Sequence, residues 1–422
     1  MQASFRLSTI ARQMRGYATS ARVTELTTPK PDDIVVTRSA MCRAFKGSFR
    51  DTSPDTLLYQ TLQKGVKEAG LKPGQVEDII VGNCHLPSPA YHARAAALAA
   101  GFPEHVPVEA INRLCASGLQ AIRHVADSIR AGDIEIGIAA GVESMTHNPR
   151  PSPVFEEKAI DECQPAIDCA EPMGWTSENV AADFNISRED MDKWGLASHN
   201  RASEASKSGR FLEEIIPIDT TIHADAKDKS SPVSNITVTE DDGIRHGMTM
   251  EKMAAAKPAF SWGNKQSTGP NTSQMTDGAA MAVLMKRSTA EALGQPILAT
   301  YITSATVGVT PKYMGIGPVP AITKALKSAG LSKDDVDVFE INEAFSSMMV
   351  YTTRELGLDP AKVNPNGGAI ALGHPLGATG IRQVVTGLHE VIRRNQEQKG
   401  PKILVTSMCV GSGMGAAAVF AV

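Results

Sequence analysis

Short apolar runs rich in β-branched residues alternate along this chain with stretches that have the spacing of amphipathic helices. Strands are predicted at residues 33–37, 78–81, 134–139, 403–407 and 416–420. Helices are predicted between them, for example at 118–126 and 178–207. Apolar strands that alternate with helices are typical of α/β layers with largely buried sheets. We therefore expect an α/β fold.

Four short strings recur later in the chain in the same order, which indicates an internal duplication. Ala69-Gly70-Leu71 returns 260 positions later, and each copy ends a helical stretch and leads into an apolar run. Residues 115–118 match 374–377 at an offset of 259, and an arginine follows in both copies. Residues 142–144 match 410–412 at an offset of 268, and residues 278–284 match 415–421 at an offset of 137. These offsets predict two homologous halves, with about 130 extra residues inside the first.

The extra segment is more polar than the rest of the chain and contains helical stretches, so we expect an inserted subdomain and not a linker. The predicted division has four parts. They are a targeting leader at 1–22, an N-terminal half at 30–150 plus 276–293, the insert at 151–275, and a C-terminal half at 294–422.

The leader is rich in Arg and Ser and has no acidic residue before Glu25, which is typical of an organelle presequence. Arg6-Leu7, followed after five residues by Gln13-Met14, resembles an N-terminal peroxisomal signal. Residues 15–18 resemble a mitochondrial processing site instead. We expect the peroxisomal matrix, with the mitochondrial matrix as the alternative, and an organelle import receptor as a partner of this segment.

Composition narrows the class of protein further. With 42 Lys and Arg against 46 Asp and Glu, the net charge of −4 gives no reason to expect a nucleic-acid partner. No run of 18 apolar residues occurs, so a membrane span is not expected. Six scattered cysteines without a CxxC pair predict free thiols and no metal site.

Two residues at matching places in the duplication are candidates for nucleophilic chemistry. Cys115 precedes a predicted helix, whose dipole and free N–H groups favour a thiolate, although a buried inert cysteine is the alternative. The duplication places His374 before the equivalent helix, where it could also be an ordinary core histidine. If the halves pack about a pseudo-twofold axis, both residues approach one site, and a Cys–His pair activates a thiol.

Two further candidates follow predicted strands of the C-terminal half. Cys409 comes after the strand at 403–407 and opens a glycine-rich loop with Gly411, where backbone N–H groups can receive an oxyanion. Asn342 also follows a strand, and it could serve only as a helix N-cap. Each of these residues alone has a structural explanation, so the combination carries the functional hypothesis.

Four motifs in order resemble the thiolase family: Cys115-Ala-Ser117, Asn342-Glu-Ala-Phe345, Gly373-His-Pro375 and Cys409-Val-Gly411. The resemblance extends over 33–422 and is greatest to the peroxisomal type of 3-ketoacyl-CoA thiolase. It implies a duplicated α-β-α-β-α layered fold with an inserted loop subdomain. It also implies a homodimer and no cofactor, with CoA as a substrate.

The resemblance assigns a role to each catalytic candidate. Cys115 is expected to carry the acyl group, and His374 to activate it and to stabilise the enolate oxygen. Asn342 is expected to hold a water in the same oxyanion hole. Cys409 is expected to exchange the proton at C2 of acetyl-CoA. The backbone N–H groups of Cys115 and Gly411 are expected to form a second oxyanion hole.

The insert is implied to hold CoA and to shape the acyl pocket. Arg245, Thr249 and Ser273 fall in stretches that resemble CoA-contacting regions, and Met173 falls where the family places a residue against the acyl end. The expected activity is CoA-dependent cleavage of 3-ketoacyl-CoA in fatty-acid β-oxidation. The alternatives are an acetyl-CoA C-acetyltransferase, a non-catalytic acyl-CoA or lipid carrier, and a Cys–His hydrolase.

Overall fold

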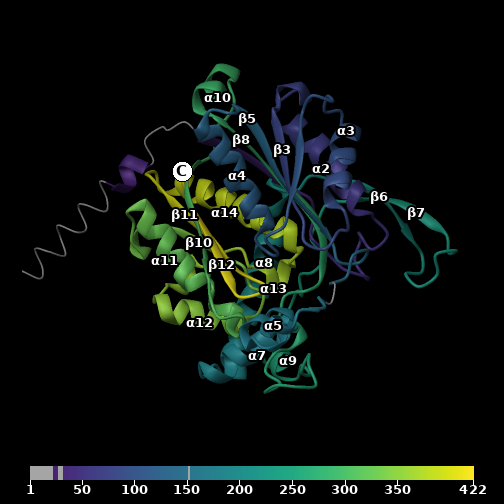
Figure 1. The fold of residues 1–422 in the computed structure, drawn as a ribbon, viewed down its shortest axis with the longest axis vertical. Coiled ribbons are helices and arrows are strands. Elements are labelled where there is room, and N and C mark those ends of the chain that lie inside the picture. Colours follow the sequence, from purple (N-terminus) through teal and green to yellow (C-terminus); the bar gives the residue numbers. More distant parts are fainter. Residues whose placement is uncertain (1–21, 27–31, 151–152) are drawn as a thin grey trace, which may run out of the picture.

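The computed structural model of the chain describes residues 22–26, 32–150 and 153–422 (Figure 1). The predicted leader therefore lies, except for Arg22, outside the described residues, and its signal-like residues 6–14 receive no structural account. The side chains of residues 32–35 are likewise not described.

The described strands form one large mixed sheet and one separate hairpin. The large sheet has the order β10-β11-β12-β9-β1-β8-β5-β3-β4, and β2 pairs with β8. Its strands are β1 (Asp32–Arg38), β2 (Cys42–Arg43), β3 (Asp78–Gly82), β4 (Val108–Ile111), β5 (Ile136–Ser144), β8 (Thr276–Lys286), β9 (Thr300–Gly308), β10 (Val338–Ile341), β11 (Ile403–Val410) and β12 (Met414–Ala421). The hairpin consists of β6 (Ile218–His223) and β7 (Val233–Val238).

The large sheet consists of two similar parts that join at β1 and β9. In the first part β1, β8, β5 and β3 are neighbours, and in the second part β9, β12, β11 and β10 follow the same order. In both parts the last pair is parallel and the pairs before it are antiparallel. β8 follows the insert in sequence but lies between β1 and β5, which precede it.

The helices cover both outer faces of this arrangement and fill its centre (Figure 1). α2 and α3 pack on the first part, α11 and α12 lie on the second part, and α4 and α14 pack together between the two. The predicted duplicated, layered α/β fold is thereby confirmed. The helices of the two halves are α2 (Pro54–Glu68), α3 (Pro89–Ala99), α4 (Ser117–Ala131), α10 (Arg287–Leu293), α11 (Pro318–Ala329), α12 (Ser346–Leu356), α13 (Ala369–Leu372) and α14 (Leu376–Glu397).

Local sequence explains why the two outer helices end where they do. Both copies of the repeated Ala-Gly-Leu string lie at the C-terminal end of a helix, α2 in the first half and α11 in the second. Gly70 and Gly330 have φ angles of 66° and 71°, the left-handed conformation that glycine adopts without strain at a helix C-terminus. At the other end of α2, the Ser53 hydroxyl accepts a hydrogen bond from the Thr56 N–H at 3.1 Å.

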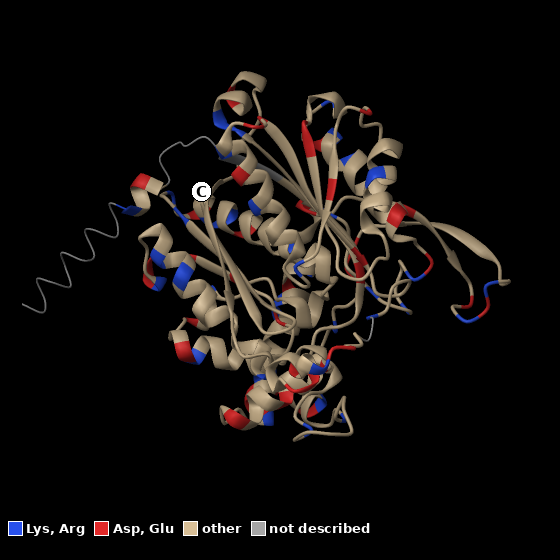
Figure 2. Cartoon of the chain, viewed as in Figure 1, with Lys and Arg blue, Asp and Glu red and all other residues tan. Residues whose placement is uncertain are grey.

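The insert region contains short helices, one long helix and the hairpin. Its helices are α5 (Lys158–Asp161), α6 (Gln164–Ile167), α7 (Met173–Asp183), α8 (Arg188–Lys207) and α9 (Met250–Ala254). Arg38 of β1 is fully buried and pairs with Glu214 at 2.6 Å and Asp241 at 2.8 Å, which anchors this region to the sheet. In Figure 2 the charged residues lie mainly on helices and loops, including the hairpin tip, and much less on the central strands.

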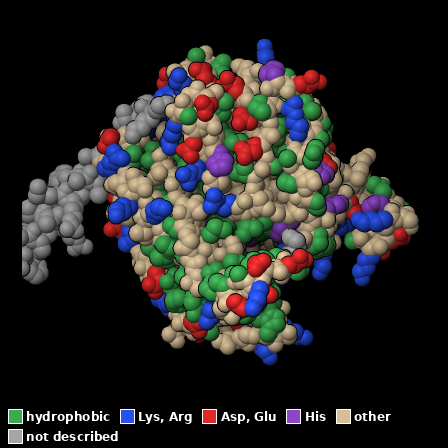
Figure 3. Space-filling model, in the orientation of Figure 1, with side chains coloured by type: hydrophobic (Ala, Val, Ile, Leu, Met, Phe, Trp, Pro, Cys, Tyr) green, Lys and Arg blue, Asp and Glu red, His purple; other side chains and the backbone are tan. Residues whose placement is uncertain are grey.

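The surface matches the charge balance of the sequence. On the face shown in Figure 3, basic and acidic side chains are interspersed and do not gather into one basic patch. Within the described part of the chain, no helix combines the length and the apolar character that crossing a membrane would require.

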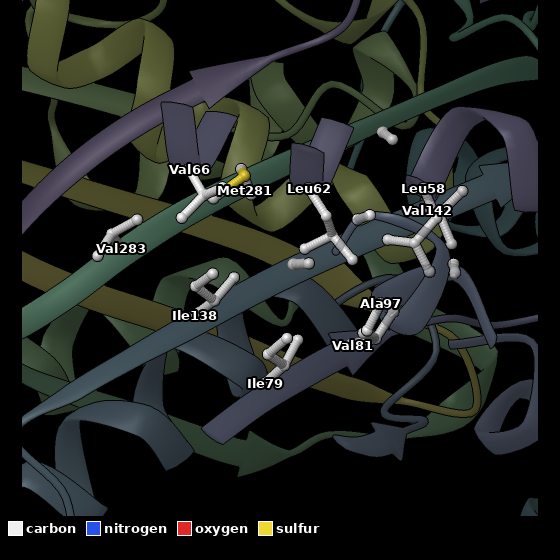
Figure 4. Close-up of a cluster of buried hydrophobic side chains, with 14 of the residues drawn as sticks. Leu58, Leu62, Val66, Ile79, Val81, Ala97, Ile138, Val142, Met281 and Val283 are labelled. Atoms are coloured by element: carbon white, nitrogen blue, oxygen red, sulfur yellow. The ribbon is translucent and has the colours of Figure 1, made fainter. Parts of the chain in front are cut away.

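The core of the first half illustrates how the layers are held together (Figure 4). Apolar side chains of α2 and α3 meet side chains from β3, β5 and β8, and all of them are almost completely buried. The labelled members are Leu58, Leu62, Val66, Ile79, Val81, Ala97, Ile138, Val142, Met281 and Val283. Burial of such side chains is the main favourable contribution to folding.

Two predicted elements differ from the structure. The strand predicted at 134–139 is β5, which begins at Ile136 and continues to Ser144. The helical stretch predicted at 178–207 is broken into α7 and α8. Asn185 between them has a φ of 53°, and the Ser187 hydroxyl caps α8 by accepting from the Asp190 N–H. These two local features outweigh the continuous helical pattern.

The central helices α4 and α14 approach each other through glycines. A Cβ atom on Gly118 of α4 would lie 2.6 Å from the carbonyl oxygen of Gly377, and one on Gly380 of α14 would lie 2.4 Å from the Leu119 nitrogen. Such distances are far below normal contact, so only glycine permits this crossing.

We expect the Gly118→Ala variant to lose about 1–3 kcal/mol of stability, because an added methyl forces the central helices apart. The midpoint of thermal unfolding measures the loss. Gly308→Ala is the matched control, since a Cβ there meets nothing within 4 Å. Equal midpoints for the two variants would show that the crossing tolerates a side chain.

Candidate active site

The helix crossing brings the two halves of the candidate site together. Cys115 lies two residues before α4, and His374 lies two residues before α14. The first turns of these helices are in contact through Gly118 and Gly377. The convergence expected from the duplication is therefore present in the structure.

Cys115 sits on a constrained turn between β4 and α4. The preceding residue, Leu114, has a φ of 49°, an unusual conformation for a residue with a branched side chain. Cys115 retains some exposure to solvent, whereas Cys409 has none. Burial raises the pKa of the Cys115 thiol to about 11, although the N–H groups of Gly411 and of Cys115 itself favour the thiolate.

His374 is held by hydrogen-bonding groups on both ring nitrogens. Its Nδ1 lies 2.7 Å from the Thr379 hydroxyl, and its Nε2 lies 3.2 Å from Nδ2 of Asn342. Burial, assisted by the charge of Arg382, lowers the pKa of His374 to about 3. The imidazole is therefore neutral at pH 7. With Nδ2 of Asn342 donating to Nε2, Nδ1 carries the proton.

Asn342 follows β10 and is completely buried. Its backbone N–H donates to the Ser407 carbonyl oxygen at 2.8 Å, which fixes it to β11. Its side-chain Oδ1 is buried and has no hydrogen-bond partner among the described residues. A buried acceptor of this kind requires a partner, such as an ordered water or a ligand.

Cys409 lies near the end of β11, with Sγ 3.4 Å from Sδ of Met348. Burial, and then the nearby Cys115, raise the pKa of Cys409 well above its ordinary value. The strand predicted at 403–407 continues to Val410, so Cys409 belongs to the strand and does not open the loop. Gly411 directly follows β11, and a Cβ there would lie 3.7 Å from Sδ of Met173. Met173 thus lies beside the loop whose N–H faces Cys115.

One electrostatic expectation was wrong in sign. The position of Cys115 before a helix predicts a lowered pKa, yet the structure gives a raised one. The thiol lies in an enclosed site, and the loss of hydration exceeds the contribution of the N–H groups. Without a ligand, the Cys115 thiol and the His374 imidazole are therefore both neutral.

The three predicted CoA contacts lie in less enclosed positions. The Ser273 hydroxyl donates to the Ala344 carbonyl oxygen at 3.0 Å, which places it beside the motif of Asn342. Arg245 is exposed, and its Nη2 is 3.6 Å from where a Cβ of Gly269 would be. Thr249 is exposed and caps α9 by accepting from the Lys252 N–H at 3.4 Å.

Sequence reasoning missed residues that hold the candidates in place. The Thr276 hydroxyl accepts from the His374 N–H at 3.0 Å, and the Thr379 hydroxyl orients the His374 ring. Glu343 and Glu143 are buried carboxylates next to candidate residues. Both glutamates lie in strings that the sequence singles out, but no local pattern reveals the partners of their carboxylates.

Glu343 links the candidate site to the insert. Its carboxylate accepts from the Trp194 indole N–H at 3.1 Å and the Ser198 hydroxyl at 2.6 Å, both on α8. It also accepts from the Ile370 N–H at 3.2 Å, in the segment that leads to His374. A single carboxylate beside Asn342 therefore fixes the insert to the segment that leads to His374.

The described residues contain no group of three or more His, Cys, Asp and Glu side chains placed to hold a metal ion. The acid–base groups that the structure does bring together are thiols and one imidazole. Such a set suits nucleophilic attack by sulfur and proton transfer at carbon.

Family models match nearly all of the chain. Residues 34–288 match the model described as thiolase, N-terminal domain, and residues 295–422 match the model described as thiolase, C-terminal domain. The human protein named 3-ketoacyl-CoA thiolase, peroxisomal, is 50% identical over 392 residues, which covers 92% of this chain and 90% of the relative.

Two solved structures from Saccharomyces cerevisiae are also similar. One is described as the dimeric peroxisomal thiolase and aligns with a TM-score of 0.85 and 41% identity, covering 94% of this chain and 99% of its own. The other, a peroxisomal 3-ketoacyl-CoA thiolase, aligns with a TM-score of 0.74 and 38% identity, covering 93% and 97%. It is described as five-layered and built from two core domains of identical topology, which matches the layers seen in Figure 1.

Proposed function

This chain belongs to the thiolase family, and from that premise we propose that it is a 3-ketoacyl-CoA thiolase of fatty-acid β-oxidation. As an acyltransferase it cleaves 3-ketoacyl-CoA with CoA to give acetyl-CoA and a shortened acyl-CoA. The observation that supports this function best is the convergence of two cysteines, one histidine and one asparagine at the contact between the two halves.

The first step is the acylation of Cys115. The neutral His374 accepts the thiol proton of Cys115 on Nε2, and the sulfur attacks the C3 carbonyl carbon of the substrate. The bond between C2 and C3 then breaks. The acyl group stays on Cys115 as a thioester, and the bonding electrons leave on the enolate of acetyl-CoA.

The enolate is stabilised by fixed donors and then receives a proton. Protonated His374 and a water held by Asn342 donate to the enolate oxygen, and such groups lower the barrier by several kcal/mol. The Cys409 thiol donates its proton to C2, which completes acetyl-CoA. The raised pKa of Cys409 keeps this thiol protonated until the carbanion forms.

CoA is the second substrate and completes the cycle. Its thiol gives its proton to the Cys409 thiolate, and its sulfur attacks the acyl-Cys115 thioester. The bond between the acyl carbon and the Cys115 sulfur breaks, the shortened acyl-CoA is released, and Cys115 takes its proton back from His374. We assign the oxyanion of this step to the backbone N–H groups of Cys115 and Gly411, and their hydrogen bonds to the Cys115 sulfur support this role. The steps use the protein's own side chains and CoA, so we propose that no cofactor takes part.

Arg245, Thr249 and Ser273 are proposed to contact CoA, and Met173 to contact the acyl end. The position of Met173 beside Gly411 supports its role, because an acyl group on Cys115 extends from the same point. Exposed Arg245 is available to a phosphate group of CoA. We also infer a homodimer, as the yeast neighbour is described, which sedimentation of the full chain measures.

The range of acyl lengths separates the proposed function from the acetyl-CoA C-acetyltransferase alternative. We expect comparable rates of CoA-dependent cleavage for 3-ketohexadecanoyl-CoA and acetoacetyl-CoA, measured by loss of the 3-ketoacyl-CoA absorbance. Activity confined to acetoacetyl-CoA would overturn the proposal in favour of the acetyltransferase.

The same assay tests the carrier alternative. Cys115→Ser is expected to lower turnover by about 10³-fold or more, because the acyl-carrying thiol is lost. Cys163→Ser is the matched control, since Cys163 is an exposed free cysteine of the insert region. Unchanged turnover in Cys115→Ser would favour a non-catalytic carrier.

The roles of the two cysteines separate in partial reactions. Cys409→Ser is expected to slow exchange of the C2 protons of acetyl-CoA by about 100-fold, because the proton donor at carbon is lost. Acetylation of Cys115 by acetyl-CoA should decline far less, and mass spectrometry of the trapped acyl-enzyme measures it. Equal loss of both partial reactions would contradict this division. Unchanged activity in Cys409→Ser would instead suit a Cys–His hydrolase, which needs no second cysteine.

The compartment proposed for this chain is the peroxisome, because its human and yeast relatives are named peroxisomal. A reporter protein that carries residues 1–22 is expected to enter peroxisomes through an import receptor. Replacing Arg6 and Leu7 by alanine should leave the reporter in the cytosol. Import of the unaltered fusion into mitochondria would instead favour the processing-site interpretation.

A further inference from the structure

Glu143 is a completely buried carboxylate for which the proposed chemistry has no use. It is the second-last residue of β5, and its carboxylate accepts hydrogen bonds from four N–H donors. Oε1 accepts from the His85 N–H at 3.1 Å and from Nδ2 of Asn83 at 3.3 Å. Oε2 accepts from the N–H groups of Cys84 at 3.0 Å and Gly377 at 3.1 Å. Four donors match the accepting capacity of one carboxylate.

Burial of this carboxylate is unfavourable in itself. Loss of hydration raises the pKa of Glu143 to about 7, and the four donors act in the opposite direction. An apolar residue would fill the same volume without that cost. The presence of a carboxylate at this position must therefore be explained by the hydrogen bonds that it accepts.

The donors of Glu143 belong to two different halves of the molecule. Asn83, Cys84 and His85 form the segment that follows β3 in the first half. Gly377 lies in the first turn of α14, three residues after His374. One carboxylate therefore holds a loop of the first half against the helix that follows the histidine of the second half.

A short chain of hydrogen bonds continues from the same loop to the nucleophile. The Cys84 carbonyl oxygen accepts from Nδ2 of Asn112 at 3.0 Å. Oδ1 of Asn112 then accepts from the N–H of Leu114 at 2.8 Å, and Leu114 is the residue with a φ of 49° directly before Cys115. Glu143 is thus connected to the turn before Cys115 on one side and to the helix after His374 on the other.

The duplication shows that the two halves use this position differently. Asn83 follows β3 as Asn342 follows β10, and these asparagines are separated by 259 positions, as are Cys115 and His374. Glu143 in the first half corresponds to Gly411 in the second half. In the second half the asparagine contacts His374, and Gly411 has no side chain beside its backbone N–H. In the first half the side chains of Asn83 and Glu143 hold neighbouring segments together.

We propose that Glu143 is a positioning residue that fixes the nucleophile Cys115 and the base His374 relative to each other. This inference rests on the proposed function. Glu143 acts through Asn112 and Gly377, without touching the substrate. Its loss should therefore reduce the rate of the chemical step and leave substrate binding nearly unchanged.

Glu143→Gln is the test variant, because it keeps the shape but offers an NH₂ group to donors that need an acceptor. We expect kcat for thiolysis to decrease by about tenfold or more and KM to change by less than about threefold. Glu178→Gln is the matched control. The Glu178 carboxylate also accepts from two backbone N–H groups, those of Gln266 and Ser267, but both belong to the insert region. Its kcat should change by less than about threefold.

Asn112→Ala provides a second variant in case the buried substitution prevents folding. Asn112 is exposed, so its removal breaks the connection to Leu114 without creating a buried cavity. We expect a lower kcat with an unchanged KM, and the double variant with Glu143→Gln should be no slower than Glu143→Gln alone.

The outcomes separate this inference from the proposed function. A wild-type chain that cleaves no 3-ketoacyl-CoA would overturn the proposed function itself. An active wild type with an unchanged kcat in both Glu143→Gln and Asn112→Ala would overturn the positioning role alone. Additive losses of kcat in the double variant would also contradict it, because an arrangement that both residues maintain can be lost only once. A rise in KM as large as the loss of kcat would contradict it as well.

Discussion

Glycines at the crossing of α4 and α14 determine the geometry on which the site depends. Gly118 and Gly377 face each other, and neither position has room for a Cβ atom. Each helix begins two residues after a candidate catalytic side chain, so the distance between the helices decides whether these side chains meet. A side chain at the crossing would separate Cys115 from His374 while leaving both halves able to form their own sheets.

The same close packing determines the charge state of the site. Burial reduces the hydration of the Cys115 thiol and the His374 imidazole, so both groups are neutral when no substrate is bound. In the proposed reaction, charge develops only when the proton moves and the sulfur attacks, and at that moment the fixed N–H groups act in an environment of low polarity. Enclosure therefore makes the free thiol less acidic, yet it strengthens every donor that stabilises the anion formed from the substrate.

Repetition in the sequence was sufficient to predict the duplication, whereas the local prediction of a lowered pKa for Cys115 failed because burial depends on distant segments. The duplicated strings predicted two halves, and the glycines after α2 and α11 ended those helices as expected. The features that the sequence did not predict are contacts between segments that lie far apart in the chain. The break at Asn185 depends on one left-handed residue and one cap, and the donors to Glu143 come from two segments that lie far apart in the chain, residues 83–85 and Gly377. No periodic pattern records such contacts.

Buried carboxylates connect the parts of this molecule that duplication and insertion brought together. Arg38 joins the insert region to the sheet through Glu214, and Glu343 joins α8 to the segment of Asn342. Glu143 joins the first half to the helix of the second. A carboxylate that accepts several N–H or O–H groups is costly to displace, so each junction tolerates little movement. The segments that carry Asn342 and His374 are therefore held firmly against the rest of the molecule.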